Sequence, residues 1–359
     1  RESVTDFDPA TFDPDNSFAR IGEGSLGGKA RALAFVRHLL RDFGVTEQFP
    51  GIQITVPPCV VLGTDVFDRC LQENDLRQFA MGADDDRENE ERFLASSFPP
   101  EIEKKLADVL DLVSYPLAVR SSSLLEDSQY QPLAGVYKTY MLPNIDPDLS
   151  TRLTQLVTAV KRVYASTFCM AAKQFLKMTP YRLEEEKMAV IIQKLVGARH
   201  GDRFYPDFAG VGRSHNFYPT APLKAEDGVV AVALGMGKTV VDGGTILRFS
   251  PKYPRHLVTH SSVDDILSSS QREFYALDLH RAPDQIGTDE GSELTRYGLR
   301  EAEEDDTLAA LGSTYSPDND VVYDGISRPG VRVVSFAPIL KHQLFPLAEL
   351  MDGLLKLGD

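Results

Sequence analysis

The stretch from Pro116 to Tyr140 constrains this chain more than any other part of its sequence. It begins with a short apolar run that has the composition of a buried strand end. The run stops at Arg120, three hydroxyl side chains follow at Ser121–Ser123, and an acidic pair comes next at Glu126-Asp127. A strand that ends in a guanidinium and several hydroxyls is suited to hold a polyanion.

Two interpretations of this stretch are open from the residues alone. In the first, Arg120 donates its planar fork of N–H groups to phosphate oxygens, and the hydroxyls and free backbone N–H groups hold the same oxygens. In the second, the stretch is a capped loop, because Ser123 followed by Leu-Leu-Glu126 matches a capping box at the start of a helix. Short motifs match by chance often, so these residues do not decide between the two.

A glycine-rich turn near the N-terminus is a second candidate anion site. Glycines between residues 22 and 28 precede Lys29, and residues 30–43 carry apolar side chains at helical spacing. We therefore expect Lys29 at the start of a helix, where backbone N–H groups and the helix dipole favour an anion. The turn is not a Walker loop, because Ala30 stands where Ser or Thr would bind magnesium. The alternative is an ordinary helix start with an exposed lysine.

Two apolar runs in the second half of the chain carry further candidates. Gln193 interrupts the run from Lys187 to Val196, which we expect to be a strand. A buried amide needs a hydrogen-bond partner, so Gln193 is either a satisfied core residue or a ligand contact. The run from Val229 leads into a loop that contains Gly235 and Gly237.

These motifs, in this order, resemble the nucleotide-binding domain of phosphoenolpyruvate synthase and pyruvate phosphate dikinase. That family opens with Leu-Gly-Gly-Lys before a helix, with the lysine on the ATP phosphates, and Lys29 matches it. Pro132-Leu133 departs from the family's Ser-Phe, and Lys238 stands where the family has a glutamate. The family's Ala-Val-Arg-Ser-Ser, Glu-Asp, Ala-Gly and Thr-Tyr pattern holds in order and spacing through Arg120, Ser121, Ser122, Glu126, Asp127, Ala134, Gly135, Thr139 and Tyr140.

The resemblance implies a role for each candidate residue. Lys29 and Arg120 would supply the positive charge for catalysis, and Gln193 would help to place the base. Lys173, late in a helical region, is the candidate for a basic residue that the family places near phosphate. Arg213 reaches either a phosphate or solvent. The complete set of expected nucleotide contacts is Lys29, Arg120, Ser121, Lys173, Gln193, Arg213, Gly235 and Gly237.

The resemblance also implies an α+β fold of the ATP-grasp type, with a nucleotide cleft between two lobes. We expect an extended leader over residues 1–20, a first lobe over 21–185 and a second lobe over 186–359. A charged, irregular insertion is expected at about 280–330. The second lobe is expected to be truncated, since the family's next strands, with two magnesium-binding carboxylates and a Gln-x-Arg-Pro pattern, do not occur. The ligands of Mg²⁺ are therefore expected beyond Asp359.

Composition excludes several kinds of partner. A net charge of −15 opposes binding to nucleic acid, although a local basic pocket for ATP remains possible. No apolar run approaches the roughly 20 residues of a membrane span, and we expect no signal peptide in the polar N-terminal residues. The cysteines Cys59, Cys70 and Cys169 lie far apart and are typical of buried thiols in a reducing compartment. We therefore expect a cytoplasmic protein without a membrane or nucleic-acid partner.

The expected function is that of an ATP-binding domain in a phosphotransferase. In the family, ATP phosphorylates a histidine on a mobile domain, which then phosphorylates pyruvate. Those phosphohistidine and pyruvate-binding domains would lie in the parent chain. We interpret His260 as an ordinary loop histidine and not as the phosphate acceptor. This piece alone is therefore expected to be inactive. Two alternatives remain open: a catalytically degenerate nucleotide-sensing or structural module, consistent with Lys238, and a protein-interaction domain without a ligand.

Overall fold

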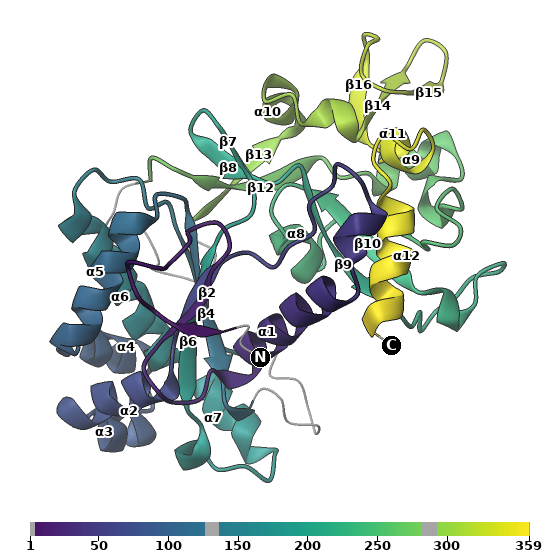
Figure 1. Cartoon of the computed structure of the whole chain (residues 1–359). Coiled ribbons are helices and arrows are strands. Elements are labelled where there is room, and N and C mark those ends of the chain that lie inside the picture. Colours follow the sequence, from purple (N-terminus) through teal and green to yellow (C-terminus); the bar gives the residue numbers. More distant parts are fainter. Residues whose placement is uncertain (1–3, 126–135, 282–292, 359) are drawn as a thin grey trace. The chain divides into compact units, whose positions relative to one another are not determined.

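The computed structural model describes residues 4–125, 136–281 and 293–358 (Figure 1). The chain divides into two compact units. Unit 1 comprises residues 1–195 and 280–293, and unit 2 comprises residues 196–279 and 294–359. Both units mix helices with strands, which confirms the expected α+β class.

Unit 1 is built on a six-stranded sheet with the strand order β1-β2-β3-β6-β4-β5. Strand β6 lies inside this sheet and pairs antiparallel with both β3 and β4. All but the last of its residues are buried, which explains why its sequence is a continuous apolar run rather than an alternating one. The strands are β1 Thr5–Asp6, β2 Phe18–Ile21, β3 Cys59–Leu62, β4 Leu117–Ser123, β5 Thr139–Leu142 and β6 Met188–Lys194.

Helices cover both faces of this sheet. Val190 and Ile192 of β6 belong to the larger core, which is shared with α2, α5 and α6. Ala189 and Ile191 point to the other face, where they pack with Ala30 of α1. Figure 1 shows α1 on one side of the strands and α2 to α6 on the other. The helices are α1 Gly27–Asp42, α2 Thr64–Glu73, α3 Leu76–Gly82, α4 Asp86–Leu94, α5 Pro100–Leu112, α6 Leu149–Ser166 and α7 Met170–Lys177.

Unit 2 contains three smaller sheets, with the orders β11-β10-β9, β13-β12-β8-β7 and β15-β14-β16. Arg203 of β8 donates to both carboxylate oxygens of the largely buried Asp305, and Tyr205 donates to the same group at 2.7 Å. This network ties β8 to the chain that follows α10. The strands are β7 Ala198–His200, β8 Arg203–Tyr205, β9 Phe208–Arg213, β10 Val229–Leu234, β11 Leu247–Phe249, β12 Glu273–Asp278, β13 Leu294–Gly298, β14 Gly312–Ser316, β15 Val321–Asp324 and β16 Val331–Val334.

The helices of unit 2 are short except for the last. The C-terminal helix α12 packs on β9, where a Cβ added to Gly212 would lie 2.6 Å from Met351 Cε. Among the described residues, no helix is long and apolar enough to pass through a membrane. The helices are α8 Lys238–Val241, α9 Val263–Ser269, α10 Leu299–Glu304, α11 Ala337–Leu340 and α12 Leu347–Gly358.

The observed boundaries differ from the sequence expectation in three places. The expected leader contains most of β2, which pairs with β3, because Phe18 and Ala19 are apolar enough to be buried in the sheet. The first unit extends to residue 195 rather than 185, because β6 completes its sheet. The expected irregular insertion contains β13 to β15 and α10, whose buried residues include Leu308 and Thr314.

Candidate functional site

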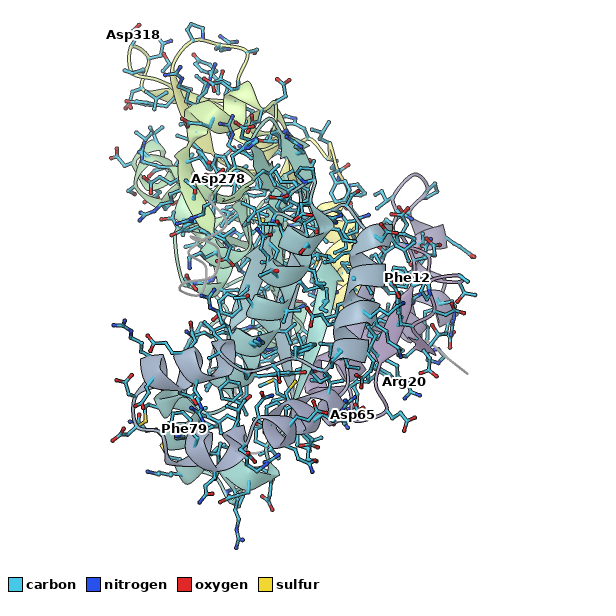
Figure 2. All side chains as sticks on the ribbon, turned by 90° about the vertical axis from the view of Figure 1, so that its left-hand side faces the viewer. Phe12, Arg20, Asp65, Phe79, Asp278 and Asp318 are labelled. Atoms are coloured by element: carbon cyan, nitrogen blue, oxygen red, sulfur yellow. The ribbon has the colours of Figure 1, made fainter. Side chains whose placement is uncertain are left out.

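The start of α1 lies directly against strand β4. Gly27 has a φ of +71°, and a Cβ at this position would lie only 1.9 Å from the carbonyl oxygen of Ser122. The preceding turn is held to the start of α2, since Gly24 N donates to Asp65 Oδ1 at 2.8 Å (Asp65 is labelled in Figure 2). Glycine is therefore required where the turn meets the sheet, because any side chain would push the helix away from β4.

Ser122 uses its hydroxyl to hold the helix in place. Its Oγ accepts a hydrogen bond from Ala30 N at 3.0 Å and donates one to Leu26 O at 2.8 Å. The side chain is completely buried. Of the hydroxyls that follow Arg120, this one therefore has a structural task.

The neighbouring hydroxyl contacts the candidate lysine. Lys29 Nζ lies 3.1 Å from Ser121 Oγ, although the two residues are 92 positions apart in the sequence. Ser121 is buried, and Lys29 is half-buried in the first turn of α1. The structure thus brings the glycine-rich turn and the Arg-Ser-Ser motif into contact.

Arg120 points toward strand β6. Its Nη1 donates to Gln193 Oε1 at 2.9 Å, and Gln193 Nε2 donates to Pro57 O at 3.4 Å. Gln193 is therefore a satisfied buried amide that also orients the arginine. We call Lys29, Arg120, Ser121 and Gln193 the phosphate-type cluster, since the Lys29–Ser121 and Arg120–Gln193 contacts involve consecutive residues of β4.

Sequence reasoning missed Glu186, which closes the end of β4. Its carboxylate is completely buried and accepts hydrogen bonds from Leu124 N at 3.1 Å, Leu125 N at 3.2 Å and Tyr137 Oη at 2.6 Å. Burial raises its pKa above the ordinary value, although these hydrogen bonds act in the opposite direction. Glu184 and Glu185 are exposed, so nothing in the run of three glutamates marks the third as buried.

Lys173, another predicted nucleotide contact, is hydrogen-bonded to backbone carbonyl groups. Its Nζ donates to Ala80 O at 2.7 Å and also to Ala83 O, so α7 is joined to the C-terminal end of α3. Burial lowers the pKa of this lysine. The ammonium group thus caps a helix end, where backbone carbonyls and the helix dipole favour a cation.

The glycine loop and Arg213 belong to unit 2. Gly235 has a φ of +82°, and a Cβ there would lie 2.8 Å from both Phe274 Cδ2 and Tyr275 O. Gly237 precedes the short helix α8. Lys238 forms an ion pair with Asp242 at 3.2 Å. Gly235 therefore allows β10 to end closely packed against β12.

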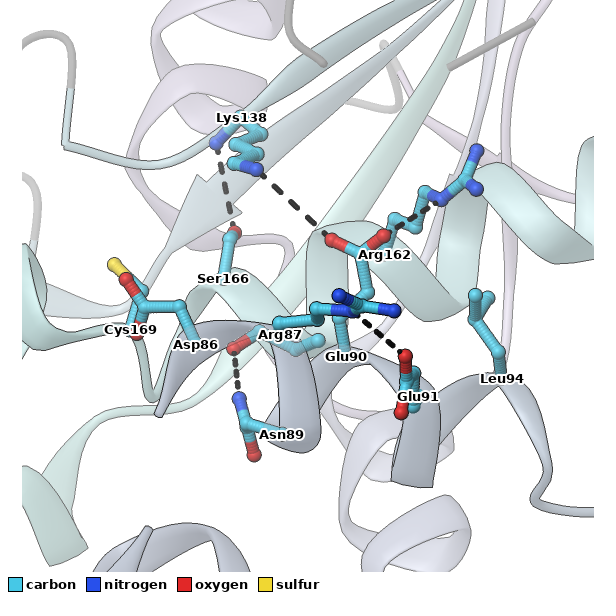
Figure 3. A pocket seen from close by; sticks show the side chains of 11 residues that line it. Asp86, Arg87, Asn89, Glu90, Glu91, Leu94, Lys138, Arg162, Ser166 and Cys169 are labelled. Carbon is cyan, nitrogen blue, oxygen red and sulfur yellow. Dashed lines mark hydrogen bonds and ion pairs between the residues drawn. The ribbon is translucent and has the colours of Figure 1, made fainter. Parts of the chain in front are cut away.

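A cavity of about 620 Å³ in unit 1 is lined by none of the predicted nucleotide contacts (Figure 3). Glu90 lies between Arg162, whose Nε is 3.1 Å away, and Lys138, whose Nζ is 3.9 Å away. Arg87 pairs with Glu91 at 3.0 Å. The charged groups of this cavity thus neutralise one another.

Part of the Arg-Ser-Ser motif region and the expected metal ligands have no position in the described structure. The residues Glu126, Asp127, Pro132, Leu133, Ala134 and Gly135 lie outside the described residues. Within residues 4–125, 136–281 and 293–358, no three His, Cys, Asp or Glu side chains are grouped so that they could hold a metal ion.

Comparison with known proteins agrees with this arrangement of motifs. The family described as "Pyruvate phosphate dikinase, AMP/ATP-binding domain" matches residues 23–303. The chain belongs to this family. The family resemblance that the sequence motifs indicated is thereby confirmed.

A curated relative points in the same direction. The "Uncharacterized phosphotransferase YvkC" of Bacillus subtilis (strain 168) is 26% identical over 195 residues. The match covers 53% of this chain and 20% of the relative, so the chain corresponds to about a fifth of that protein's length. The family membership thus supports an ATP-binding domain related to phosphotransferases.

Proposed function

We propose that the phosphate-type cluster binds the phosphates of ATP, and that the chain is the nucleotide-binding part of a phosphotransferase. In this proposal the phosphoryl group passes to a histidine on another domain, in a parent protein with phosphohistidine and pyruvate-binding domains. The observation that carries the proposal is the 3.1 Å contact between Lys29 Nζ and Ser121 Oγ, which joins two anion-type motifs distant in sequence.

The chemistry of the cluster suits a polyphosphate. Arg120 presents a planar fork of donors, and Lys29 adds a compact second charge at the start of a 16-residue helix. The helix dipole favours an anion at the same end. Phosphoryl transfer depends chiefly on positioning and charge neutralisation, which these groups supply.

Other residues would complete the site. Gln193 would help to place the base while it orients Arg120. Gly235 and Gly237 would let the backbone of unit 2 approach the phosphates. Mg²⁺ is the expected cofactor and would neutralise charge on the transferred group when bound.

A nucleotide-sensing module without catalysis is the second candidate. The pairing of Lys238 with Asp242 favours it, because this lysine stands where the resembling family has a glutamate. Both candidates require ATP binding at the phosphate-type cluster. They differ in the parent protein, where transfer releases ADP or AMP and sensing does not.

Calorimetric titration with ATP and magnesium tests the binding site. Lys29→Ala and Arg120→Ala should each raise the dissociation constant about tenfold or more, as expected for the loss of one charge-assisted contact. Lys104→Ala and Arg87→Ala are matched controls, since both side chains are strongly exposed on other helices of unit 1. Unchanged ATP affinity in the Lys29 and Arg120 variants, with a lowered melting temperature, would show that the cluster is structural.

A further inference from the structure

Unit 2 contains a second cavity, of about 410 Å³, at the ends of strands β9 to β11. The loop over residues 215–223 and the segment over residues 256–259 form its other walls. The volume lies within the range of about 300–1,000 Å³ that small-molecule sites occupy. The lining residues that carry the argument are Arg213, His215, Phe217, Tyr218, Arg248 and His256.

The two arginines share one face of the β9–β11 sheet. Arg213 lies opposite Val229, and Arg248 lies opposite Ala231, two residues further along β10. Side chains two residues apart on a strand point to the same face, so both guanidinium groups extend from this face. Both are exposed, and neither makes a hydrogen bond or an ion pair within the described part of the chain.

The cavity is positively charged. Arg213, Arg248 and two histidines line it, and none of its lining residues in the described structure is acidic. Nearby Asp227 already pairs with Lys252 Nζ at 2.8 Å and accepts from Lys224 N at 2.7 Å. In a protein with a net charge of −15, this local excess of positive charge is a specific feature of the cavity.

Aromatic rings stand at the same cavity. Phe217 is 67% exposed and Tyr218 is 91% exposed. The ring of His215 packs edge-on against Phe217 with the centroids 4.8 Å apart. Asn216 holds the loop, because its N donates to Ala225 O at 2.8 Å and its Oδ1 accepts from Tyr218 N at 3.1 Å. A fixed loop thus presents two ring faces to solvent beside the arginines.

We propose that this cavity binds a small phosphorylated compound that carries a planar ring. The arginine forks match phosphate oxygens, and exposed Phe and Tyr rings offer stacking surfaces to a planar group. All its lining residues belong to unit 2, whereas the phosphate-type cluster belongs to unit 1. The proposal does not depend on ATP binding in unit 1.

Calorimetry with phenyl phosphate as the probe tests this site. We expect 1:1 binding, weakened about tenfold by Arg213→Gln or Arg248→Gln and more by the double variant. Tyr218→Ser should weaken it by a smaller factor, since it removes only a stacking surface. Arg296→Gln is the matched control in unit 2, because this arginine is exposed and pairs only with Glu273 at 3.3 Å among the described contacts. Lys29→Ala should bind the probe as the unaltered chain does.

Three companion probes identify the recognised groups. Inorganic phosphate and phenol should each bind more weakly than phenyl phosphate, and benzoate should bind more weakly if phosphate is the anion recognised. Equal binding of benzoate would overturn the assignment to a phosphate. Binding that survives the double arginine variant would overturn the site. Loss of ATP affinity in the double variant would also overturn it, since the cavity would then be part of the ATP site.

Discussion

At the residue scale, Glu186 is buried although the two preceding glutamates of the same run are exposed. A glutamate that is completely buried loses the hydration that favours its charged form. Backbone N–H groups of Leu124 and Leu125 and the hydroxyl of Tyr137 compensate for part of this loss. The net effect of burial is a raised pKa, so the native protein holds this proton to a higher pH than the unfolded chain does.

The raised pKa of Glu186 predicts the direction of a pH effect on stability. A group whose folded pKa is raised contributes stability below its ordinary pKa of 4.5, and loses it as pH rises through the folded pKa. Glu186→Gln removes this titration but keeps an acceptor for the N–H groups. The melting temperature of the unaltered chain, minus that of Glu186→Gln, should therefore decrease as pH rises above about 4.5.

Thermal melts from pH 4 to pH 8, roughly the window in which a raised carboxyl pKa lies, measure this difference. Glu184→Gln is the control, because Glu184 is exposed in the same run of glutamates. The difference in melting temperature between the unaltered chain and Glu184→Gln should be independent of pH. A difference that grows with pH for Glu186→Gln would mean that hydrogen bonding outweighs burial.

At the element scale, the contact of α1 with β4 connects backbone geometry to the candidate site. Gly27 and Ser122 hold the start of the helix on the strand, and Lys29 follows within the first turn. The position of Lys29 against Ser121 therefore depends on a glycine two residues before the lysine.

Gly27→Ala should disrupt this contact. Its Cβ would meet the Ser122 carbonyl, so we expect a loss of unfolding free energy of about 3 kcal/mol or more, together with weaker ATP binding. Gly51→Ala is a matched control: Gly51 has a φ of +82°, but a Cβ there meets no atom within 4 Å. It should cost only the backbone strain, about 1 kcal/mol.

Urea denaturation and ATP titration of both variants measure these effects. Equal losses of stability would show that the positive φ, rather than the close approach to β4, requires glycine at position 27. Unchanged ATP affinity in Gly27→Ala would separate the start of α1 from the nucleotide site.

At the scale of the whole molecule, the two proposed sites belong to different units. Ligands that bind them should slow backbone hydrogen exchange in different parts of the chain, since a bound ligand suppresses local opening around its site. ATP should protect residues 24–32, 117–123 and 188–194. Phenyl phosphate should protect residues 213–223 and 248–259. Mass spectrometry of peptides from the exchanged protein resolves these ranges, and protection of one common set by both ligands would contradict two separate sites.

The sequence predicted the local features of the candidate site correctly where they depend on near neighbours. Residues 30–43 lie in or directly follow α1, and the apolar run around Gln193 forms β6, because helical spacing and a continuous buried strand leave clear patterns. The strand in the expected leader was harder to predict from the sequence, because β2 has only four residues. Its burial depends on pairing with β3, which starts 41 positions after the start of β2.

The sequence by itself determined the α+β class and the family, since motif order and spacing are properties of the chain alone. Only the tertiary structure decided that Lys29 meets Ser121, that Arg120 meets Gln193, and that Glu186 is buried. It also decided that Arg213 and Arg248 share a sheet face. These relations follow from strand register and from the closure of long loops, which no local pattern specifies, because a shift of one residue in register would turn each side chain to the opposite face.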